Sequence, residues 1–222
     1  MKILYVSEFF PTKDGRFTGG VEARNYFVAR GLAKRHKVTV ITSQVTKSKS
    51  FEKIAGISVH RVGPKRKYSA SVGSIVDRIR FILAAIKFAK TASFDIVDGS
   101  NFITHLIAKI IAKSQRLPVV AWYPDIWIGS WLAIAGPLGV LGEILERINI
   151  KLGFDAYVTI SEIKAKLLHQ YVKGPVSVIK CGIDPNEFTG SSNKAKEPTI
   201  LCISRLVPYK HIEHPEIRLE AE

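Results

Sequence analysis

The chain has 222 residues, enough for one large domain or for one domain and part of a second. Apolar residues make up 46% of it, so the sequence can bury a sizeable core and a disordered chain is excluded. The net charge is +14, because 33 Lys and Arg residues face 19 Asp and Glu residues. Such a surplus of basic residues favours anionic partners: nucleic acid, acidic lipid surfaces or phosphorylated small molecules.

Neither secretion nor a membrane span is expected. The opening residues, MKILYVSEFFP, have too short an apolar run for a signal peptide, and the longest apolar stretch, residues 79–89, is interrupted by Arg80 and Lys87. Cys181 and Cys202 lack metal-ligand spacing and are expected to be small buried residues in a reducing compartment. We therefore expect a cytoplasmic protein, either free or peripheral on the inner face of the membrane.

The first elements predict a parallel sheet. Residues 3–6 are a short apolar run, typical of a strand that is buried on both faces. A loop at residues 7–20 leads into a helix at residues 21–35, and residues 38–42 form a second buried strand. The apolar side of this helix is expected to comprise Val21, Phe27, Val28 and Leu32. Strand, helix and strand in this order indicate a right-handed βαβ crossover.

The alternation continues and predicts a doubly wound α/β domain with a mostly parallel, Rossmann-like sheet. Further strands are expected at residues 58–62, 95–98, 119–122, 156–160 and 176–179. Further helices are expected at residues 75–90, 102–113, 141–152 and 162–171. The helix at residues 75–90 carries an apolar stripe of Ile75, Ile79, Ile82 and Ile86.

The composition changes after the last of these strands. We assign residues 1–184 to the Rossmann-like domain. Residues 185–198 are rich in Pro, Gly, Ser and Asn and predict a linker. Residues 199–203 begin a new strand, so residues 199–222 are interpreted as the truncated start of a second domain.

A glycine pair, Gly19 and Gly20, precedes the first helix, where free N–H groups can face a phosphate. A turn that simply needs glycine explains the pair equally well. The dinucleotide fingerprint is absent, because no G-x-G-x-x-G follows the strand and residues 42–44 end the second strand without a carboxylate. A nicotinamide-dependent oxidoreductase is therefore not expected.

Several segments resemble glycosyltransferase family 4, a group of retaining enzymes of the GT-B fold. They are GGVE at residues 19–22, RHKVTVIT at 35–42, SEIKAKLL at 161–168, VIKCGIDPNEF at 178–188 and ISRLVPYK at 203–210. Their order and spacing cover nearly the whole chain. The resemblance implies that residues 1–184 are the acceptor-side, N-terminal half of a GT-B fold.

The resemblance also implies where the donor binds. Arg205 and Lys210 match the family's basic pair, which neutralises the donor diphosphate, and Gly19 and Gly20 would close over the phosphates from the other side. Two fixed cations can stabilise a departing nucleoside diphosphate without a metal. The nucleotide-sugar is then a co-substrate, and no metal or cofactor is expected.

The acceptor is expected beside the segment VVAWYPDIWIGSW at residues 119–131, where Pro124-Asp125 stands in place of the family's frequent His-Asp. Asp125 is the predicted catalytic residue, because it could hold a hydroxyl of the acceptor or of the transferred sugar. The predicted acceptor contacts are Glu22, His105, Tyr123 and Trp127. Sugar rings stack on aromatic side chains. Core packing of the aromatic residues and of His105, and capping by Asp125, are the structural alternatives.

The function that the resemblance implies is glycosyl transfer from a nucleotide-sugar to an acceptor hydroxyl, on a glycan or a lipid-linked glycan. The family's paired donor-domain glutamates would lie beyond residue 222, so this chain alone is expected to be inactive. One alternative is a non-enzymatic Rossmann-like protein that binds anionic partners such as nucleic acid, although no helix-turn-helix, zinc or RNP pattern supports a nucleic-acid partner. Another is a GT-B sugar-nucleotide epimerase.

A membrane surface is a further candidate partner. The helix at residues 75–90 is amphipathic and contains Arg78, Arg80, Lys87 and Lys90. Such a helix can lie on an anionic bilayer, and the basic residues 65–67 just ahead favour this. An ordinary helix that covers the sheet explains the same pattern.

Overall fold

The computed structural model describes residues 1–183 except 16, 18, 47 and 67–73. By its contacts the chain divides into two units, Met1–Cys181 and Gly182–Glu222. The predicted linker and the predicted start of a second domain, residues 185–222, lie outside the described residues. Cys181 is exposed, so the expectation of a buried cysteine is wrong at that position.

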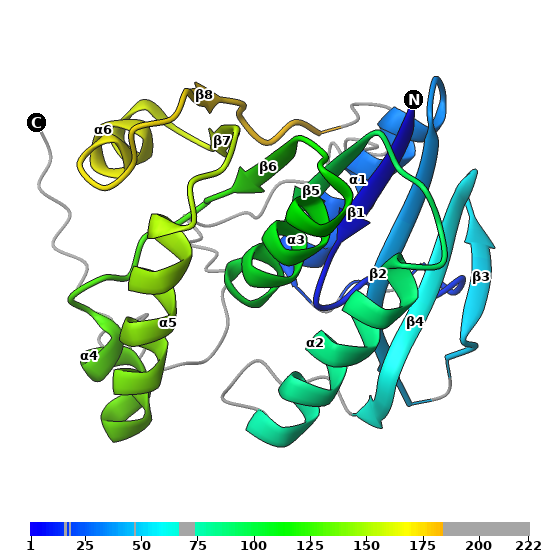
Figure 1. Ribbon diagram of the computed structural model, residues 1–222, viewed down its shortest axis with the longest axis horizontal. Coiled ribbons are helices and arrows are strands. Elements are labelled where there is room, and N and C mark those ends of the chain that lie inside the picture. Colours follow the sequence, from blue (N-terminus) through cyan, green and yellow to red (C-terminus); the bar gives the residue numbers. More distant parts are fainter. Residues whose placement is uncertain (16, 18, 47, 67–73, 184–222) are drawn as a thin grey trace, which may run out of the picture. The chain divides into compact units, whose positions relative to one another are not determined.

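One eight-stranded sheet, in the order β3-β4-β2-β1-β5-β6-β7-β8, forms the centre of the described part (Figure 1). Neighbouring strands pair in parallel, except that β3 runs antiparallel to β4. The strands are β1 (Lys2–Val6), β2 (Lys37–Val45), β3 (Phe51–Ile54), β4 (Ile57–Arg66), β5 (Ile96–Gly99), β6 (Val119–Trp122), β7 (Ala156–Thr159) and β8 (Val176–Val178).

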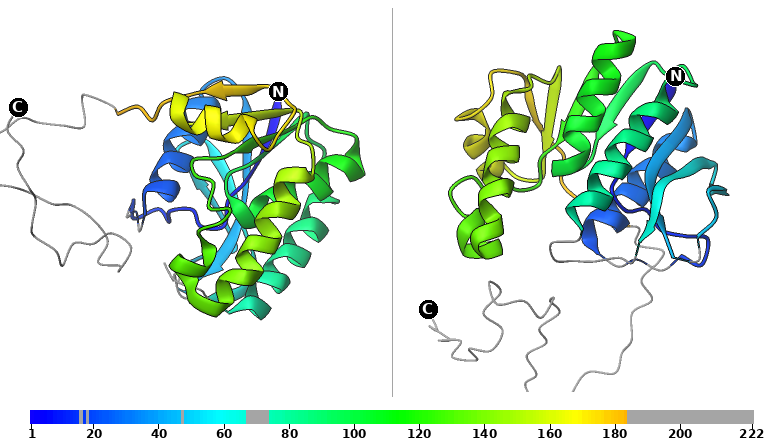
Figure 2. Two further views of the ribbon diagram at one scale, coloured as in Figure 1. Left: turned by 90° about the vertical axis from the view of Figure 1, so that its left-hand side faces the viewer. Right: turned by 60° about the horizontal axis from the view of Figure 1, so that its bottom comes forward.

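Helices cover both faces of this sheet. They are α1 (Gly20–Ala33), α2 (Ile75–Ala89), α3 (Phe102–Gln115), α4 (Trp131–Ala135), α5 (Gly139–Lys151) and α6 (Glu162–His169), with a 3₁₀ turn η1 (Gly136–Leu138) before α5. Figure 2 shows α1 on one face and α2, α3 and α5 on the other. The prediction of a doubly wound, mostly parallel α/β domain is confirmed.

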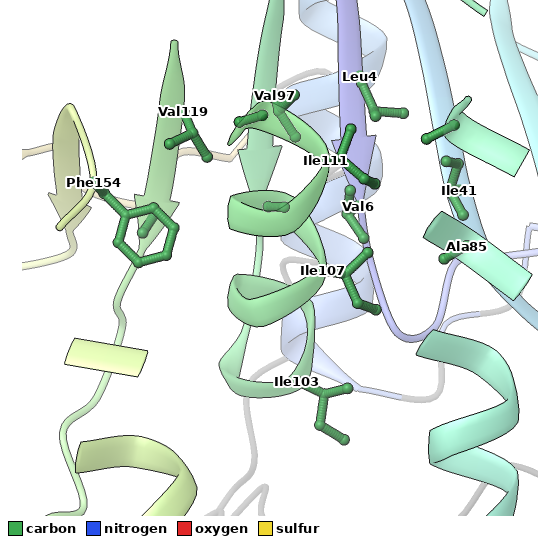
Figure 3. Close-up of a cluster of buried hydrophobic side chains, with 14 of the residues drawn as sticks. Leu4, Val6, Ile41, Ala85, Val97, Ile103, Ile107, Ile111, Val119 and Phe154 are labelled. Atoms are coloured by element: carbon green, nitrogen blue, oxygen red, sulfur yellow. The ribbon is translucent and has the colours of Figure 1, made fainter. Parts of the chain in front are cut away.

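The larger core cluster lies between the sheet and the layer of α2, α3 and α5. Helix α3 points Ile103, Ile107 and Ile111, spaced one turn apart, at the central strands (Figure 3). These isoleucines are between 0 and 4% exposed. The smaller cluster, under α1, contains Tyr5 and Phe10.

The two helices whose apolar sides were predicted bury those sides only in part. In α1 the buried residues are Glu22, Asn25 and Ala29, whereas Val21 and Phe27 are exposed. In α2 the buried residues are Phe81, Ala85 and Ala89, whereas Ile75 and Ile79 are exposed. Periodicity thus found both helices and half of each predicted side, since Val28 and Leu32 of α1 and Ile82 and Ile86 of α2 are partly buried against the core clusters.

Three short elements were not predicted. Strand β3 has a mixed sequence, FEKI, and forms a hairpin with β4 through Ala55 and Gly56, both at positive φ. Helix α4 and the turn η1 precede α5. Their segment contains Gly136 and Pro137, which are residue types typical of loops. Beyond these, the observed bounds differ from the predicted ones by a few residues at most.

A core truncation tests the packing of α3. Replacing Ile107, which is 0% exposed, with alanine should lower the free energy of unfolding by about 2–5 kcal/mol, because the change leaves a cavity under the sheet. Chemical denaturation measures this loss. Ile110→Ala on the same helix is the matched control, because Ile110 is 38% exposed and its truncation should cost well under half as much. Equal losses for the two variants would contradict the orientation of α3.

Candidate functional site

The site lies at the carboxyl edge of the parallel strands, where the loops after β1, β5, β6 and β7 emerge. Two helices begin at this edge with side-chain caps. Asn101 caps α3 in a capping box with Thr104, and Ser161 Oγ accepts from the Lys164 N–H at 3.3 Å before α6. Ligands of open α/β sheets bind outside the carboxyl ends of the strands. Helix N-termini there also favour negative charge.

The predicted phosphate-facing glycines lie at the start of α1. Gly19 is the extended N-cap residue, and Gly20, the first residue of the helix, is exposed with no atom within 4 Å of where a Cβ would stand. Glu22 is 7% exposed, in the first turn of the helix. The structure thus leaves room beside Gly20, and the donor role of the pair and the acceptor role of Glu22 remain predictions.

Next to these glycines, a buried hydrogen-bond network joins α1 to the ends of β1 and β5. The Asn25 side chain accepts from Tyr5 Oη at 2.9 Å and donates to Ser7 Oγ and Ser100 Oγ, both at 3.0 Å. Arg24 Nη1 donates to Tyr5 Oη at 2.6 Å, and its guanidinium lies 4.2 Å from the centroid of a Trp122 ring. The polar buried face of α1 is thereby satisfied at the sheet edge.

Asp98, on β5, is the unusual member of this neighbourhood. Its Oδ1 atom is buried and has no hydrogen-bond partner among the described residues. Burial raises the pKa of Asp98 to about 6, and the positive charge of Arg24 opposes this rise only in part. Burial, together with the nearby Asp98 charge, also raises the pKa of Tyr5. Sequence reasoning missed Asp98, although a single carboxylate at the carboxyl end of a buried strand was visible.

The loop after β6 is held by two carboxylates of α5. Glu146 accepts the Trp127 N–H at 3.1 Å and the Trp131 indole N–H at 2.5 Å, and Glu143 accepts the Gly129 N–H at 2.8 Å. Burial raises the pKa of Glu146, and the two tryptophan donors oppose the rise. Sequence reasoning did not identify Glu146, because its partners lie 15 and 19 residues away in the chain.

Asp125 lies on this loop at the surface. Its side chain is 48% exposed, and Oδ1 pairs with Lys164 Nζ at 2.6 Å. Lys164 belongs to the first turn of α6, so the ion pair joins the loops after β6 and β7. An exposed carboxylate with one oxygen fixed by a cation has its other oxygen available to a hydroxyl. The catalytic role of Asp125 remains a prediction.

His105 and Tyr123 lie beneath the loop. His105 is 1% exposed, its ring is stacked 4.2 Å from that of Tyr123, and its Nε2 lies 3.0 Å from the Trp122 carbonyl oxygen. Burial lowers the pKa of His105 to about 4, so the neutral ring can donate to that carbonyl. Tyr123 is 4% exposed. Both side chains support the loop from below; contact with an acceptor would require them to move and remains a prediction.

The structure therefore places most of the predicted site residues along one edge. Gly19, Gly20 and Glu22 follow β1, and Tyr123, Asp125 and Trp127 follow β6. Among them Gly20 and Asp125 are exposed, whereas Trp127 is half-buried beside Trp131, with 5.7 Å between the ring centroids. The predicted donor cations, Arg205 and Lys210, lie outside the described residues.

The titration of Asp98 predicts a pH dependence with a definite sign. Between pH 3.8 and 6 the folded chain keeps a proton that the unfolded chain has released, so the Asp98 contribution to stability falls as pH rises through this window. Asp98→Asn does not titrate. Relative to the wild type, this variant should gain up to about 3 kcal/mol of unfolding free energy between pH 4 and 7.

Denaturation curves at a series of pH values measure that difference. Glu162→Gln, an exposed change on α6, is the control and should follow the wild type throughout. A constant difference between Asp98→Asn and the wild type across the window would show that Asp98 does not titrate as described.

Glu146→Gln tests the clamp on the loop. The amide carbonyl can replace Oε2, which accepts from the Trp127 N–H at 3.2 Å and from the Trp131 indole at 2.5 Å, but the N–H₂ group then replaces Oε1 and opposes the Trp127 N–H, which lies 3.1 Å from that oxygen. The negative charge that strengthens these bonds is also lost. We expect a loss of about 1–3 kcal/mol in unfolding free energy, with a shift in the fluorescence of Trp127 and Trp131. Because Glu162→Gln makes the same chemical change at an exposed position, it should leave both readouts in place. An unaltered emission spectrum in Glu146→Gln would argue against the clamp.

Solved structures share this fold. Sucrose-phosphate synthase (tll1590) from Thermosynechococcus elongatus matches with a TM-score of 0.66 at 13% identity, over 86% of this chain and 50% of that one. Anabaena Alr3699/HepE in complex with UDP-glucose matches with a TM-score of 0.56 at 16% identity, over 86% and 47%. Arabidopsis thaliana UGT89C1 complexed with UDP matches with a TM-score of 0.50 at 9% identity, over 82% and 49%.

This chain thus spans about half the length of the solved proteins that it resembles. The likeness confirms the expected fold, a Rossmann-like domain of the kind found in the N-terminal half of GT-B proteins. A search of curated proteins finds no match to the sequence. The family model of Glycosyltransferase Family 4 matches residues 18–187, which is most of the chain. On this match the chain belongs to glycosyltransferase family 4.

Proposed function

We propose that this chain is the acceptor-side half of an enzyme that transfers a sugar from a nucleotide-sugar to a hydroxyl of a glycan or of a lipid-linked glycan. The observation that carries the proposal is the family match over residues 18–187, which include Gly20 and Asp125, both exposed at the sheet edge. Two of the solved structures with this fold contain UDP-glucose or UDP, which supports a nucleotide-sugar donor.

The donor diphosphate would face the start of α1. Gly20 leaves open space at a helix N-terminus, and the first N–H groups of that helix can donate to a phosphate oxygen. Arg205 and Lys210 would oppose the charge that develops on the departing diphosphate. With two such cations the transfer needs no metal, and we propose that it retains the anomeric configuration, as the family does.

The acceptor would approach the loop after β6. There Asp125 can accept a hydrogen bond from the acceptor hydroxyl or from a hydroxyl of the transferred sugar, while Lys164 fixes its carboxylate. The indole of Trp127 is half-buried and its backbone is fixed by Glu146, so it offers an apolar edge to a sugar ring. A rigid polar group beside a rigid aromatic ring is the arrangement that orients a hydroxyl for attack.

Sugar transfer by the complete product of the gene that encodes these 222 residues tests the proposal. Release of nucleoside diphosphate, measured with a panel of nucleotide-sugars and glycan acceptors, should fall by about 100-fold or more in Arg205→Ala and in Lys210→Ala, because each removes a fixed charge from the transition state. Asp125→Asn should lower the rate as well. Lys34→Ala, at the far end of α1, is the matched control and should retain the wild-type rate.

The 222-residue chain alone should transfer no sugar, since we place half of the cleft outside it. Robust transfer by the short chain would overturn the division into two halves. Conversion of the nucleotide-sugar into its epimer without a glycosylated acceptor would replace transfer with the epimerase alternative. Tight, salt-dependent binding of an oligonucleotide without any turnover would favour a non-enzymatic binding protein.

A further inference from the structure

The outward side of α2 is apolar although the helix already covers the sheet. Its inward side is complete, with Phe81, Ala85 and Ala89 between 0 and 1% exposed. On the opposite side four aliphatic residues, at spacings of one, three and four, are between 45 and 63% exposed. They are Ile75, Val76, Ile79 and Leu83. This side of the helix is not needed for the core.

Helix α5 repeats the arrangement at the same spacings. Its inward side consists of Glu146, Asn149 and Ile150, all buried. Its outward side has four aliphatic residues between 47 and 54% exposed. They are Val140, Leu141, Ile144 and Ile148. Helix α3 lies between α2 and α5, contacts both, and adds Ile110, which is 38% exposed (Figure 2, right).

The charges of α2 and α5 are sorted by sign. Every exposed charged residue of the two helices is basic: Arg80 and Lys87 on α2, and Arg147 and Lys151 on α5. The acidic residues of the two helices are less exposed: Asp77 and Glu143 are half-buried, and Glu146 is buried. Among these four cations, Arg147 forms an ion pair with an acidic residue of the two helices: its Nη2 lies 2.6 Å from Glu143 Oε1. We call the eight aliphatic and four basic residues the apolar–basic face.

From this face we infer a docking surface for an anionic phospholipid bilayer, with α2 and α5 lying in the plane of the headgroups. Aliphatic side chains on such a helix enter the acyl boundary, while the basic residues beside them meet lipid phosphates. The inference is independent of sugar transfer.

Other occupants fit the face less well. A second copy of the chain would bring the same cations against these cations, so that like charges would oppose the apolar contact. Nucleic acid would match the cations but would give eight aliphatic side chains nothing apolar to bury against. A bilayer with anionic headgroups supplies both a hydrocarbon phase and negative charge. The chain's net charge of +14 adds a long-range attraction of the same sign.

Co-sedimentation with vesicles tests the inference. The protein is the complete gene product, and the vesicles are either pure phosphatidylcholine or equal parts of phosphatidylcholine and phosphatidylglycerol. We expect binding to the mixed vesicles, weakened by salt, and little binding to the neutral ones. The paired variants Ile79→Ser/Leu83→Ser and Ile144→Ser/Ile148→Ser should each lower the partition coefficient by about tenfold or more. Arg80→Gln and Lys87→Gln should each lower it by about fivefold.

Two controls separate this face from non-specific attraction. Ile163→Ser and Lys166→Gln change exposed residues of α6, and Ile163 is 78% exposed, so both should bind like the wild type. All of these positions are exposed, and thermal unfolding checks that each variant is folded.

Failure to bind either kind of vesicle would overturn the inference. So would equal binding to neutral and mixed vesicles, equal losses in the α6 controls, or a concentration-dependent dimer that the serine variants abolish.

Discussion

The architecture follows from one constraint: parallel strands must be joined by crossovers, and the helices of those crossovers cover both faces of the sheet. The central strand β1 is consequently apolar and buried from Ile3 to Val6. The same constraint sends every carboxyl end to one edge. Loops that are far apart in the sequence, after β1, β5, β6 and β7, therefore meet there, and this is where polar side chains can gather without interrupting the core.

Buried polar groups at that edge are tolerated because they are paired. Asn25 serves three hydroxyl groups, and Glu146 serves a backbone amide and an indole. An unpaired buried polar group costs about 1–3 kcal/mol of stability. Each of these hydrogen bonds therefore also holds distant segments of the chain in one relative position. Exceptions among the described residues are Trp122 Nε1, Tyr123 Oη and, as the one carboxylate, Asp98 Oδ1. A chain that needed only stability would have no reason to keep a carboxylate at this position.

How much the sequence could predict depended on how local the physical signal was. Short apolar runs bounded by polar turns identified the parallel strands, and hence the fold, because burial on both faces leaves a local mark. The hairpin strand β3 left none, since FEKI is half polar and is stabilised by its pairing with β4. The facing of α1 and α2 could be predicted only in part, because the buried residues Ala29, Ala85 and Ala89 pack closely by being small rather than by being the most apolar residues.

The same difference between local and non-local signals decided which residues of the candidate site could be predicted. Asp125 was identifiable because it stands where the family frequently has His-Asp, shortly after a strand, and Gly19 and Gly20 because they precede a helix. The roles of Arg24, Asp98 and Lys164 depend on neighbours that belong to other elements, and no spacing along the chain reveals those neighbours. His105 shows the converse. Its position after β5 was compatible with a contact in the cleft or with core packing, and the stacked ring of Tyr123 and an exposure of 1% place it in the core.

Helix α5 joins the two surfaces for which we propose functions. Its inward carboxylates, Glu143 and Glu146, hold the loop that presents Asp125, and its outward aliphatic residues belong to the apolar–basic face. Because one rigid helix carries both sets, a bilayer that fixed α5 would also fix the height of Asp125 above the lipid surface. Gly142 of α5 lets the ring of Trp131 pack directly on the helix, because a Cβ at this position would stand 2.6 Å from a ring atom. The indole of Trp131 is also hydrogen-bonded to Glu146 of the same helix. An acceptor anchored in the same bilayer would then meet the loop at a constant depth, which is an economical way to orient a long substrate by its membrane end.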